Sequence, residues 1–215
     1  MKTRIDRRHW LAAVAALGLC GPTMRALAAT PTLLVLGDSL SAEYGLRRDS
    51  GWVRMLGDRL AQNGAQYSVV NASISGETTS GGRTRLASLL ERNQPAIVVI
   101  ELGANDGLRG LPLAQMRENL RAMIQASQKA GARVLLVGIR VPPNYGREYS
   151  DRFAAVYVDL ARSEKAALVP FFFEGFAEKL DMFQADRIHP NENAQQLMLD
   201  LVWPQLQPLL GRNRG

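Results

Sequence analysis

The chain has 215 residues, 47% of them hydrophobic, and carries 26 Lys and Arg residues against 20 Asp and Glu. This length is typical of one domain with a full hydrophobic core. Residues 1–28 hold five of the basic residues and one of the acidic ones, so the rest of the chain has 21 basic and 19 acidic residues. Its net charge of +2 gives no reason to expect a nucleic-acid partner.

The first 28 residues have the pattern of a secretory signal peptide. Basic residues within 1–10 precede the apolar run "LAAVAALGLCG" at 11–21, which is too short to span a bilayer. Ala26-Leu27-Ala28 then has the small-x-small spacing of a cleavage site. A buried N-terminal helix is the alternative. We predict a signal peptide at 1–28 and one domain at 29–215, which is periplasmic or secreted and has no stable membrane insertion.

Export also removes the cysteine and one of the two histidines. Cys20 and His9 both lie in the signal segment, which leaves His189 as the one histidine of the mature chain. The mature chain therefore forms no disulfide. A transition-metal site of the Cys/His type is not expected either.

The rest of the chain alternates between short apolar runs and helical patterns. Strands are predicted at 32–36, 67–70, 96–100, 134–139 and 167–170, and most are continuously apolar, as is typical of parallel strands covered on both faces. Apolar residues at helical spacing occur at 53–60, 86–90 and 113–123. A last helix is predicted to start after His189, with Pro190 near its first turn, and to run to about Leu210. This alternation predicts an α/β fold, a three-layer α/β/α sandwich around a five-stranded parallel sheet.

Four polar loops should meet at one edge of that sheet, because ligands of such sheets bind beyond the carboxyl ends of the strands. The loops are Gly37-Asp38-Ser39, "NASISGET" at 71–78, "ELGANDG" at 101–107 and "DRIHPN" at 186–191. They supply a hydroxyl, glycine N–H groups, a carboxamide, and a carboxylate three residues before a histidine. Those are the components of an acyl-transfer site.

Each loop also has an ordinary structural explanation. Ser39 could cap a helix, and Asn105 could lie in a simple turn. Gly76 could be present for its backbone freedom alone. Asp186 and His189 could merely precede a helix. These explanations are separate coincidences, and all four must hold at once to exclude a catalytic site.

Taken in order, the four blocks resemble those of the SGNH hydrolases, also called GDSL esterases. "GDSLS" at Ser39, "NASISGET" at Gly76, "GAND" at Asn105 and "DRIHPN" at Asp186 and His189 match their four blocks. The sequence is most similar to the secreted bacterial thioesterase I/lysophospholipase L1 and arylesterase group, across nearly all of residues 32–210. The resemblance implies the flavodoxin-like SGNH hydrolase fold and a serine hydrolase.

The same resemblance implies a role for each block. Ser39 would attack the carbonyl, His189 would take its proton, and Asp186 would hold the imidazole in the right tautomer, which makes a catalytic triad. The oxyanion hole would consist of the Ser39 and Gly76 N–H groups and the Asn105 side-chain amide. No metal or organic cofactor is needed. Histidine is also the side chain that changes charge near neutral pH, which suits a general base.

The implied substrates are small-molecule carboxylic esters and thioesters with an acyl or aryl group. Candidate substrate-binding residues are Leu108, Leu111, Pro142, Tyr145 and Arg187. Phe171 to Phe173 belong either to the rim of the site or to the core. Glu43 and Arg187 stand where many family members have glycine, and we expect both to bear on substrate preference. The alternatives are a carbohydrate O-acetylesterase and a non-catalytic exported module that binds lipid or glycan.

Overall fold

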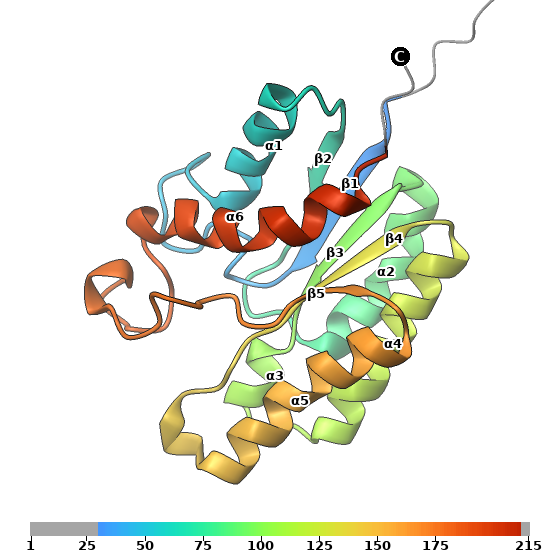
Figure 1. The fold of residues 1–215 in the computed structure, drawn as a ribbon. Coiled ribbons are helices and arrows are strands. Elements are labelled where there is room, and N and C mark those ends of the chain that lie inside the picture. The colour runs from blue at the N-terminus through green and yellow to red at the C-terminus, as the bar shows by residue number, and fades with distance from the viewer. Residues whose placement is uncertain (1–29, 212–215) are drawn as a thin grey trace, which may run out of the picture.

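The computed structural model describes residues 30–211, which fold around one five-stranded sheet (Figure 1). All neighbouring strands are parallel, in the order β2-β1-β3-β4-β5. The strands are β1 (Thr32–Gly37), β2 (Ser68–Asn71), β3 (Ile97–Glu101), β4 (Arg133–Val137) and β5 (Ala167–Val169). The predicted fold class is confirmed, and each predicted strand lies within two residues of an observed one.

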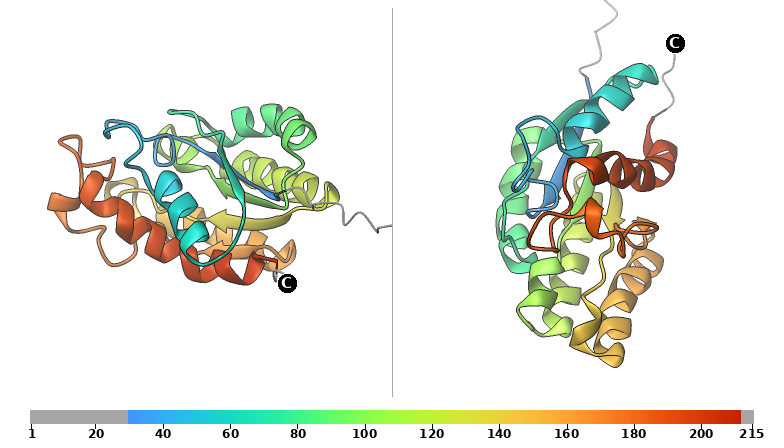
Figure 2. Two further views of the ribbon diagram at one scale, coloured as in Figure 1. Left: turned by 90° about the horizontal axis from the view of Figure 1, so that it is seen from above. Right: turned by 90° about the vertical axis from the view of Figure 1, so that its left-hand side faces the viewer.

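Helices cover both faces of the sheet (Figures 1 and 2). The larger helices are α1 (Trp52–Gln62), α2 (Thr79–Asn93), α4 (Leu113–Lys129), α5 (Arg147–Ser163) and α6 (Glu192–Leu206). Helices α1 and α6 pack together on one face, and α4 packs between α2 and α5 on the other. This arrangement follows from right-handed crossovers. The connection from β1 to β2 runs across the sheet in the opposite direction to the later connections, so its helix lies on the opposite face.

Two helical features differ from the sequence-based expectation. Helix α5 is not among the predicted helices, although Phe153, Val156, Tyr157 and Leu160 repeat at helical spacing and are all buried. The last helix starts at Glu192, where the side chain of Asn191 accepts a hydrogen bond from the N–H of Asn193 at 3.0 Å. It ends at Leu206, and a 3₁₀ turn, η3 (Gln207–Leu209), completes the predicted length.

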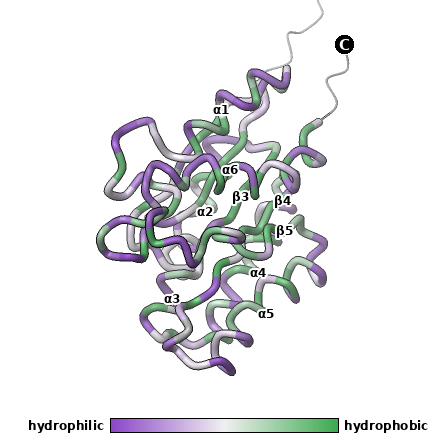
Figure 3. The backbone as a smooth tube through the Cα atoms, turned by 60° about the vertical axis from the view of Figure 1, so that its left-hand side comes forward, coloured by the Kyte–Doolittle hydropathy of each residue, from purple (hydrophilic) through white to green (hydrophobic). Residues whose placement is uncertain are grey.

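The core lies on both faces of the central strands. Leu33 to Leu36 and Ile97 to Ile100 are fully buried, and Figure 3 shows the labelled strands as mainly hydrophobic segments inside more hydrophilic loops. Phe172 is fully buried and packs edge-on against Trp52, with ring centroids 5.5 Å apart. The core explanation therefore holds for Phe172, and Phe171 and Phe173 pack against that core in partly buried positions.

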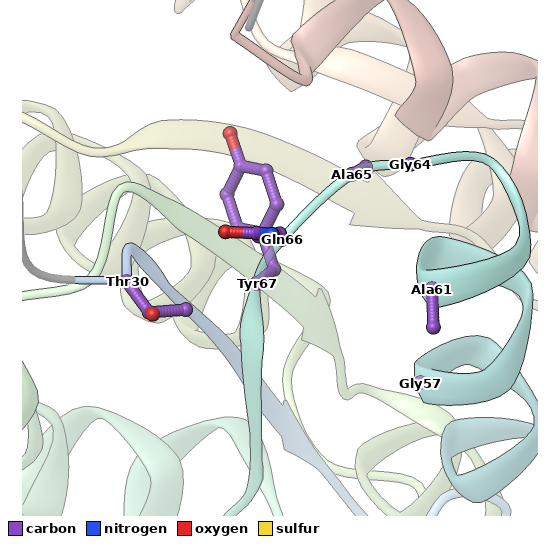
Figure 4. Close-up of a pocket in the computed structure, with 7 residues that line it drawn as sticks. All are labelled: Thr30, Gly57, Ala61, Gly64, Ala65, Gln66 and Tyr67. Atoms are coloured by element: carbon purple, nitrogen blue, oxygen red, sulfur yellow. The ribbon is translucent and has the colours of Figure 1, made fainter.

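The two edges of the sheet, at the amino and carboxyl ends of the strands, border different features. The amino ends of β1 and β2 border an open hollow of about 420 Å³ that is lined by small and polar residues, among them Thr30, Ala61 and Tyr67 (Figure 4). No candidate catalytic residue lines that hollow. The carboxyl ends of β1, β2 and β3 lead instead into the first three predicted loops, and the fourth, at 186–191, follows β5 further along the chain. None of the helices within residues 30–211 combines the length and apolar character needed to cross a membrane.

Candidate active site

Ser39 lies in a tight turn at the carboxyl end of β1. The N–H of Ala42 donates to the Asp38 carbonyl at 3.0 Å, and the chain continues in turns until α1 begins at Trp52. The N-cap of α1 is Gly51. The alternative that Ser39 caps a helix is therefore wrong, and its half-buried side chain is free to point toward other loops.

The imidazole of His189 joins Ser39 to Asp186. Its Nε2 lies 2.9 Å from the Ser39 hydroxyl oxygen, and its Nδ1 lies 2.7 Å from Asp186 Oδ2. Because a carboxylate only accepts hydrogen bonds, Nδ1 carries the proton and Nε2 is left to accept from the serine hydroxyl. The three side chains come from two loops. Ser39 and His189 are 150 positions apart in the chain.

Asp186 is held in its charged form. Partial burial acts to raise the pKa of this carboxyl, but hydrogen bonds from the His189 ring and from the N–H groups of Ile188 and His189 lower it below its usual value. The two N–H groups donate to Oδ1 at 2.9 and 3.0 Å, which leaves Oδ2 for the imidazole. This carboxylate is thus oriented by its own loop and is ready to stabilise a positively charged ring.

Three potential donors lie in the first three loops. The N–H groups of Ser39 and Gly76 have no hydrogen-bond acceptor among the described residues. Gly76 has a φ of +79°, a conformation that glycine adopts without steric cost. Asn105 lies in the short helix α3 (Ala104–Leu108), and its Nδ2 donates to Asp38 Oδ2 at 3.1 Å and to the Glu77 carbonyl at 3.0 Å. An anion that accepts from Asn105 must therefore share a hydrogen with one of these two oxygens.

A buried pair of carboxyl groups lies beneath the turn that carries Ser39, and the sequence analysis did not identify it. Glu101, at the end of β3, is 2% exposed and accepts hydrogen bonds from the Asp38 N–H at 3.3 Å and the Ser41 hydroxyl at 2.8 Å. Burial raises the pKa of Asp38 to about 6. Burial also raises the pKa of Glu101 well above its ordinary value, and the charge of Asp38 raises it further. Gly37 must be glycine here, because a Cβ would come within 2.8 Å of Glu101 and Ser41.

The predicted substrate-binding residues fall into two groups. The Tyr145 hydroxyl donates to the Leu108 carbonyl at 3.0 Å, which joins the loop after β3 to the loop after β4. Leu111 and Pro142 are exposed in the same two loops. Arg187 lies apart from them, exposed between Asp186 and His189, and its guanidinium has no hydrogen-bond or ion-pair partner within residues 30–211.

Glu43 and Arg187, the two residues that the sequence analysis singled out for substrate preference, share a backbone feature. Glu43 has a φ of +58° and Arg187 a φ of +57°, in the left-handed region that favours glycine. The Glu43 carboxylate accepts from the N–H groups of Asp49 at 3.0 Å and Gly51 at 2.7 Å, so it fixes the loop that enters α1. Glycine would adopt this backbone conformation without steric cost at both positions.

Tyr44 is a further neighbour of the site that the sequence analysis did not identify. Its ring centroid lies 4.5 Å from that of His189, with an angle of 41° between the rings. No motif in the sequence indicates this contact, since it depends on how the Ser39 and His189 loops meet. The tyrosine is half exposed, and it covers one side of the imidazole.

Comparison with known proteins identifies the family of this chain. Residues 35–197 match the family described as "GDSL-like Lipase/Acylhydrolase family", which is well over half of the chain. The chain belongs to this GDSL hydrolase family. The predicted resemblance is confirmed, and the chain is a serine esterase of this family.

The relatives agree in sequence and in structure. Esterase TesA from Pseudomonas aeruginosa is 55% identical over 85% of this chain and 91% of its own length. A crystal structure of TesA superposes with a TM-score of 0.82, covering 83% of this chain and 99% of that one. Thioesterase 1/protease 1/lysophospholipase L1 from Escherichia coli is 46% identical over 89% of this chain and 90% of its length. An arylesterase from Vibrio mimicus is 44% identical over 83% and 89%.

Proposed function

We propose that this GDSL hydrolase cleaves carboxylic esters and thioesters through an acyl-enzyme formed on Ser39. The observation that carries the proposal is the His189 ring, which lies 2.9 Å from the Ser39 oxygen and 2.7 Å from Asp186. A serine hydroxyl is a weak nucleophile until a neighbouring base takes its proton. Neutral Nε2 is oriented to accept that proton, and the adjacent carboxylate stabilises the imidazolium that results.

The reaction then has two halves. Ser39 Oγ bonds to the carbonyl carbon, the proton moves to Nε2, and His189 passes it to the departing alcohol or thiol. Water repeats the sequence on the acyl-enzyme and releases the acid. In both halves, negative charge develops on the carbonyl oxygen, for which the Ser39 and Gly76 N–H groups and the Asn105 amide are the donors.

The substrate range follows from the rim and from the names of relatives. Leu108, Leu111, Pro142 and Tyr145 lie in two loops joined by a hydrogen bond, and they offer apolar surface to an acyl chain. Relatives named thioesterase, lysophospholipase and arylesterase favour ester and thioester substrates with apolar parts. An apolar rim is a poor match for a sugar, so we place the carbohydrate O-acetylesterase second.

Hydrolysis by the purified protein tests the proposal. We expect p-nitrophenyl acetate, longer p-nitrophenyl esters, acyl-CoA and lysophosphatidylcholine to be cleaved, and acetylated xylan to be cleaved poorly. A fluorophosphonate probe should label Ser39, and Ser39→Ala should lose both the label and the activity. Ser75→Ala, in an exposed position, is the matched control and should keep both. A labelled Ser73 or Ser75 beside an unlabelled Ser39 would contradict the assignment.

We also propose that residues 1–28 are a signal peptide and that the mature enzyme, from Ala29, works outside the cytoplasm. The charged, apolar and small-residue regions of that segment support this, and it lies outside the described residues. Mass spectrometry of the N-terminus after expression should find Ala29 in the periplasmic or secreted fraction. An intact residue 1 in the cytoplasmic fraction would overturn it.

A further inference from the structure

Two large hydrophobic side chains are exposed in the two loops that meet at the His189 imidazole. Tyr44 is 50% exposed and Ile188 is 46% exposed. Tyr44 lies against the His189 ring, and Ile188 precedes His189 in the same loop. The Tyr44 hydroxyl makes no hydrogen bond to the part of the chain that the structure describes. The fold therefore does not use the polar end of this side chain, and its ring faces both the imidazole and solvent.

The position of Tyr44 is fixed by the loop that carries His189. The side-chain amide of Gln184 donates to the Tyr44 carbonyl at 2.7 Å and to the Pro190 carbonyl at 3.2 Å. The Gln184 N–H donates to the His189 carbonyl at 2.8 Å. One residue thus ties the Ser39 loop to His189 and Pro190. The contact between the two rings is part of a braced structure, which is what a binding surface needs.

The stereochemistry of the reaction decides which part of the substrate meets this surface. Around the tetrahedral carbon, one oxygen is that of Ser39 and the oxyanion points to the Gly76 and Asn105 donors. The leaving oxygen must face His189 Nε2, because that atom gives it a proton. The acyl chain takes the remaining direction. The alcohol part of an ester therefore leaves past the imidazole, beside Tyr44 and Ile188.

We propose that Tyr44 and Ile188 form a leaving-group subsite that selects esters of apolar alcohols, above all those whose aromatic ring is joined to the ester oxygen through one CH₂ group, as in benzyl esters. This rests on the proposed roles of Ser39 and His189. An aromatic ring gains from contact with the tyrosine face or edge, and the exposed isoleucine side chain offers further apolar area. The acyl chain has no part in this selection, so acyl and alcohol preferences are set by different residues.

The test compares acetates that differ only in the alcohol. Benzyl alcohol and ethanol have similar acidity, so a difference between benzyl acetate and ethyl acetate reports contact with the alcohol rather than the ease of its departure. Cyclohexylmethyl acetate separates aromatic from merely apolar preference. For each ester, kcat/KM is measured with the wild type, Tyr44→Ala, Tyr44→Phe and Ile188→Ala. Val158→Ala is the matched control, because Val158 is 40% exposed on α5, outside the site.

We expect Tyr44→Ala to lower the benzyl-to-ethyl ratio of kcat/KM by about two- to tenfold, and Ile188→Ala by about twofold. Tyr44→Phe and Val158→Ala should leave the ratio unchanged, and the preference between ethyl acetate and ethyl hexanoate should be the same in all variants. An unchanged ratio in Tyr44→Ala would overturn the subsite. An equal loss for both acetates would overturn it too, since Tyr44 would then only position His189. If Ser39→Ala still cleaves these acetates, it is the proposed function that fails instead.

Discussion

Replacing Glu101 by glutamine should make the stability of this esterase less dependent on pH. The Glu101 carboxyl is fully buried, and burial together with the charge of Asp38 raises its pKa well above the ordinary value of 4.5. It therefore holds its proton in the folded protein to a higher pH than in the unfolded chain. Folding must take a proton from solution, and this costs free energy at any pH above the ordinary pKa.

The size of this cost follows from the ordinary pKa. Because the pKa is raised in the folded state, the wild type is most stable with respect to this group below pH 4.5 and loses stability as pH rises toward the folded pKa. The loss is about 1.4 kcal/mol per pH unit from about pH 5 up to the folded pKa. For a chain of this length, each pH unit in that range corresponds to roughly 3–6 °C in Tm.

Glutamine removes this cost because it resembles a protonated glutamate. Its carbonyl oxygen can accept from the Asp38 N–H and the Ser41 hydroxyl, as Glu101 Oε2 does. Its amide can donate toward the Asp38 carboxylate, which a charged glutamate cannot do. We therefore expect Glu101→Gln to keep the Ser39 turn and most of the esterase activity, and to gain stability relative to the wild type as pH rises.

Urea unfolding of both proteins across that pH range is the measurement. The difference in the free energy of unfolding should widen with pH in favour of Glu101→Gln. Glu91→Gln is the matched control, because Glu91 is exposed on α2, and its curve should run parallel to the wild type. Parallel curves for Glu101→Gln as well would mean that Glu101 is ionised in the fold, and the reasoning from burial would be refuted.

Three other substitutions have direct consequences. Asn105→Ala should lower kcat by about 10²–10³ with little change in KM, because its amide is proposed to meet charge that exists only in the transition state; a change in KM alone would contradict this. Asp186→Asn should lower kcat/KM by about 10⁴ while near-UV circular dichroism stays native, because the wrong tautomer of His189 is favoured. Arg187→Gly should raise stability by up to about 1 kcal/mol in urea unfolding, since Arg187 has a φ of +57°. A clear loss of stability would show that its side chain has contacts that the backbone argument omits.

The sheet could be predicted from the sequence because its signal is local. Strands β1, β3 and β4 are continuous apolar runs, and the structure buries them on both faces. Helix α5 carried an equally regular pattern from Phe153 to Leu160, but its outward face exposes Val158. The start of α6 depends on the capping hydrogen bond of the Asn191 side chain, which the apolar pattern does not indicate. Apolar periodicity predicts that an element exists, and hydrogen bonds set where it ends.

The meeting of these loops was predictable for a different reason. Ser39, Gly76, Asn105 and His189 each follow a strand or precede a helix, and parallel topology brings such positions to one edge. The surroundings of these residues could not be predicted in the same way. Glu101 reaches Asp38 across 63 positions, and Tyr44 reaches His189 only because Gln184 joins their loops. Contacts of this kind depend on side-chain packing in three dimensions, which no spacing in the sequence indicates.

The carboxyl groups at this edge illustrate how one residue type is given different tasks by its surroundings. Asp186 is partly exposed and accepts from its own backbone and from His189, so its pKa is lowered and it stays charged beside the imidazole. Asp106 is buried but accepts from the N–H and hydroxyl of Thr79, which anchors α3 to α2 next to Asn105. Asp38 has its pKa raised to about 6 by burial and holds the Asn105 amide. Protonation of Asp38 would weaken that hold on the amide proposed as an oxyanion donor, so we expect acid to act on this site through Asp38.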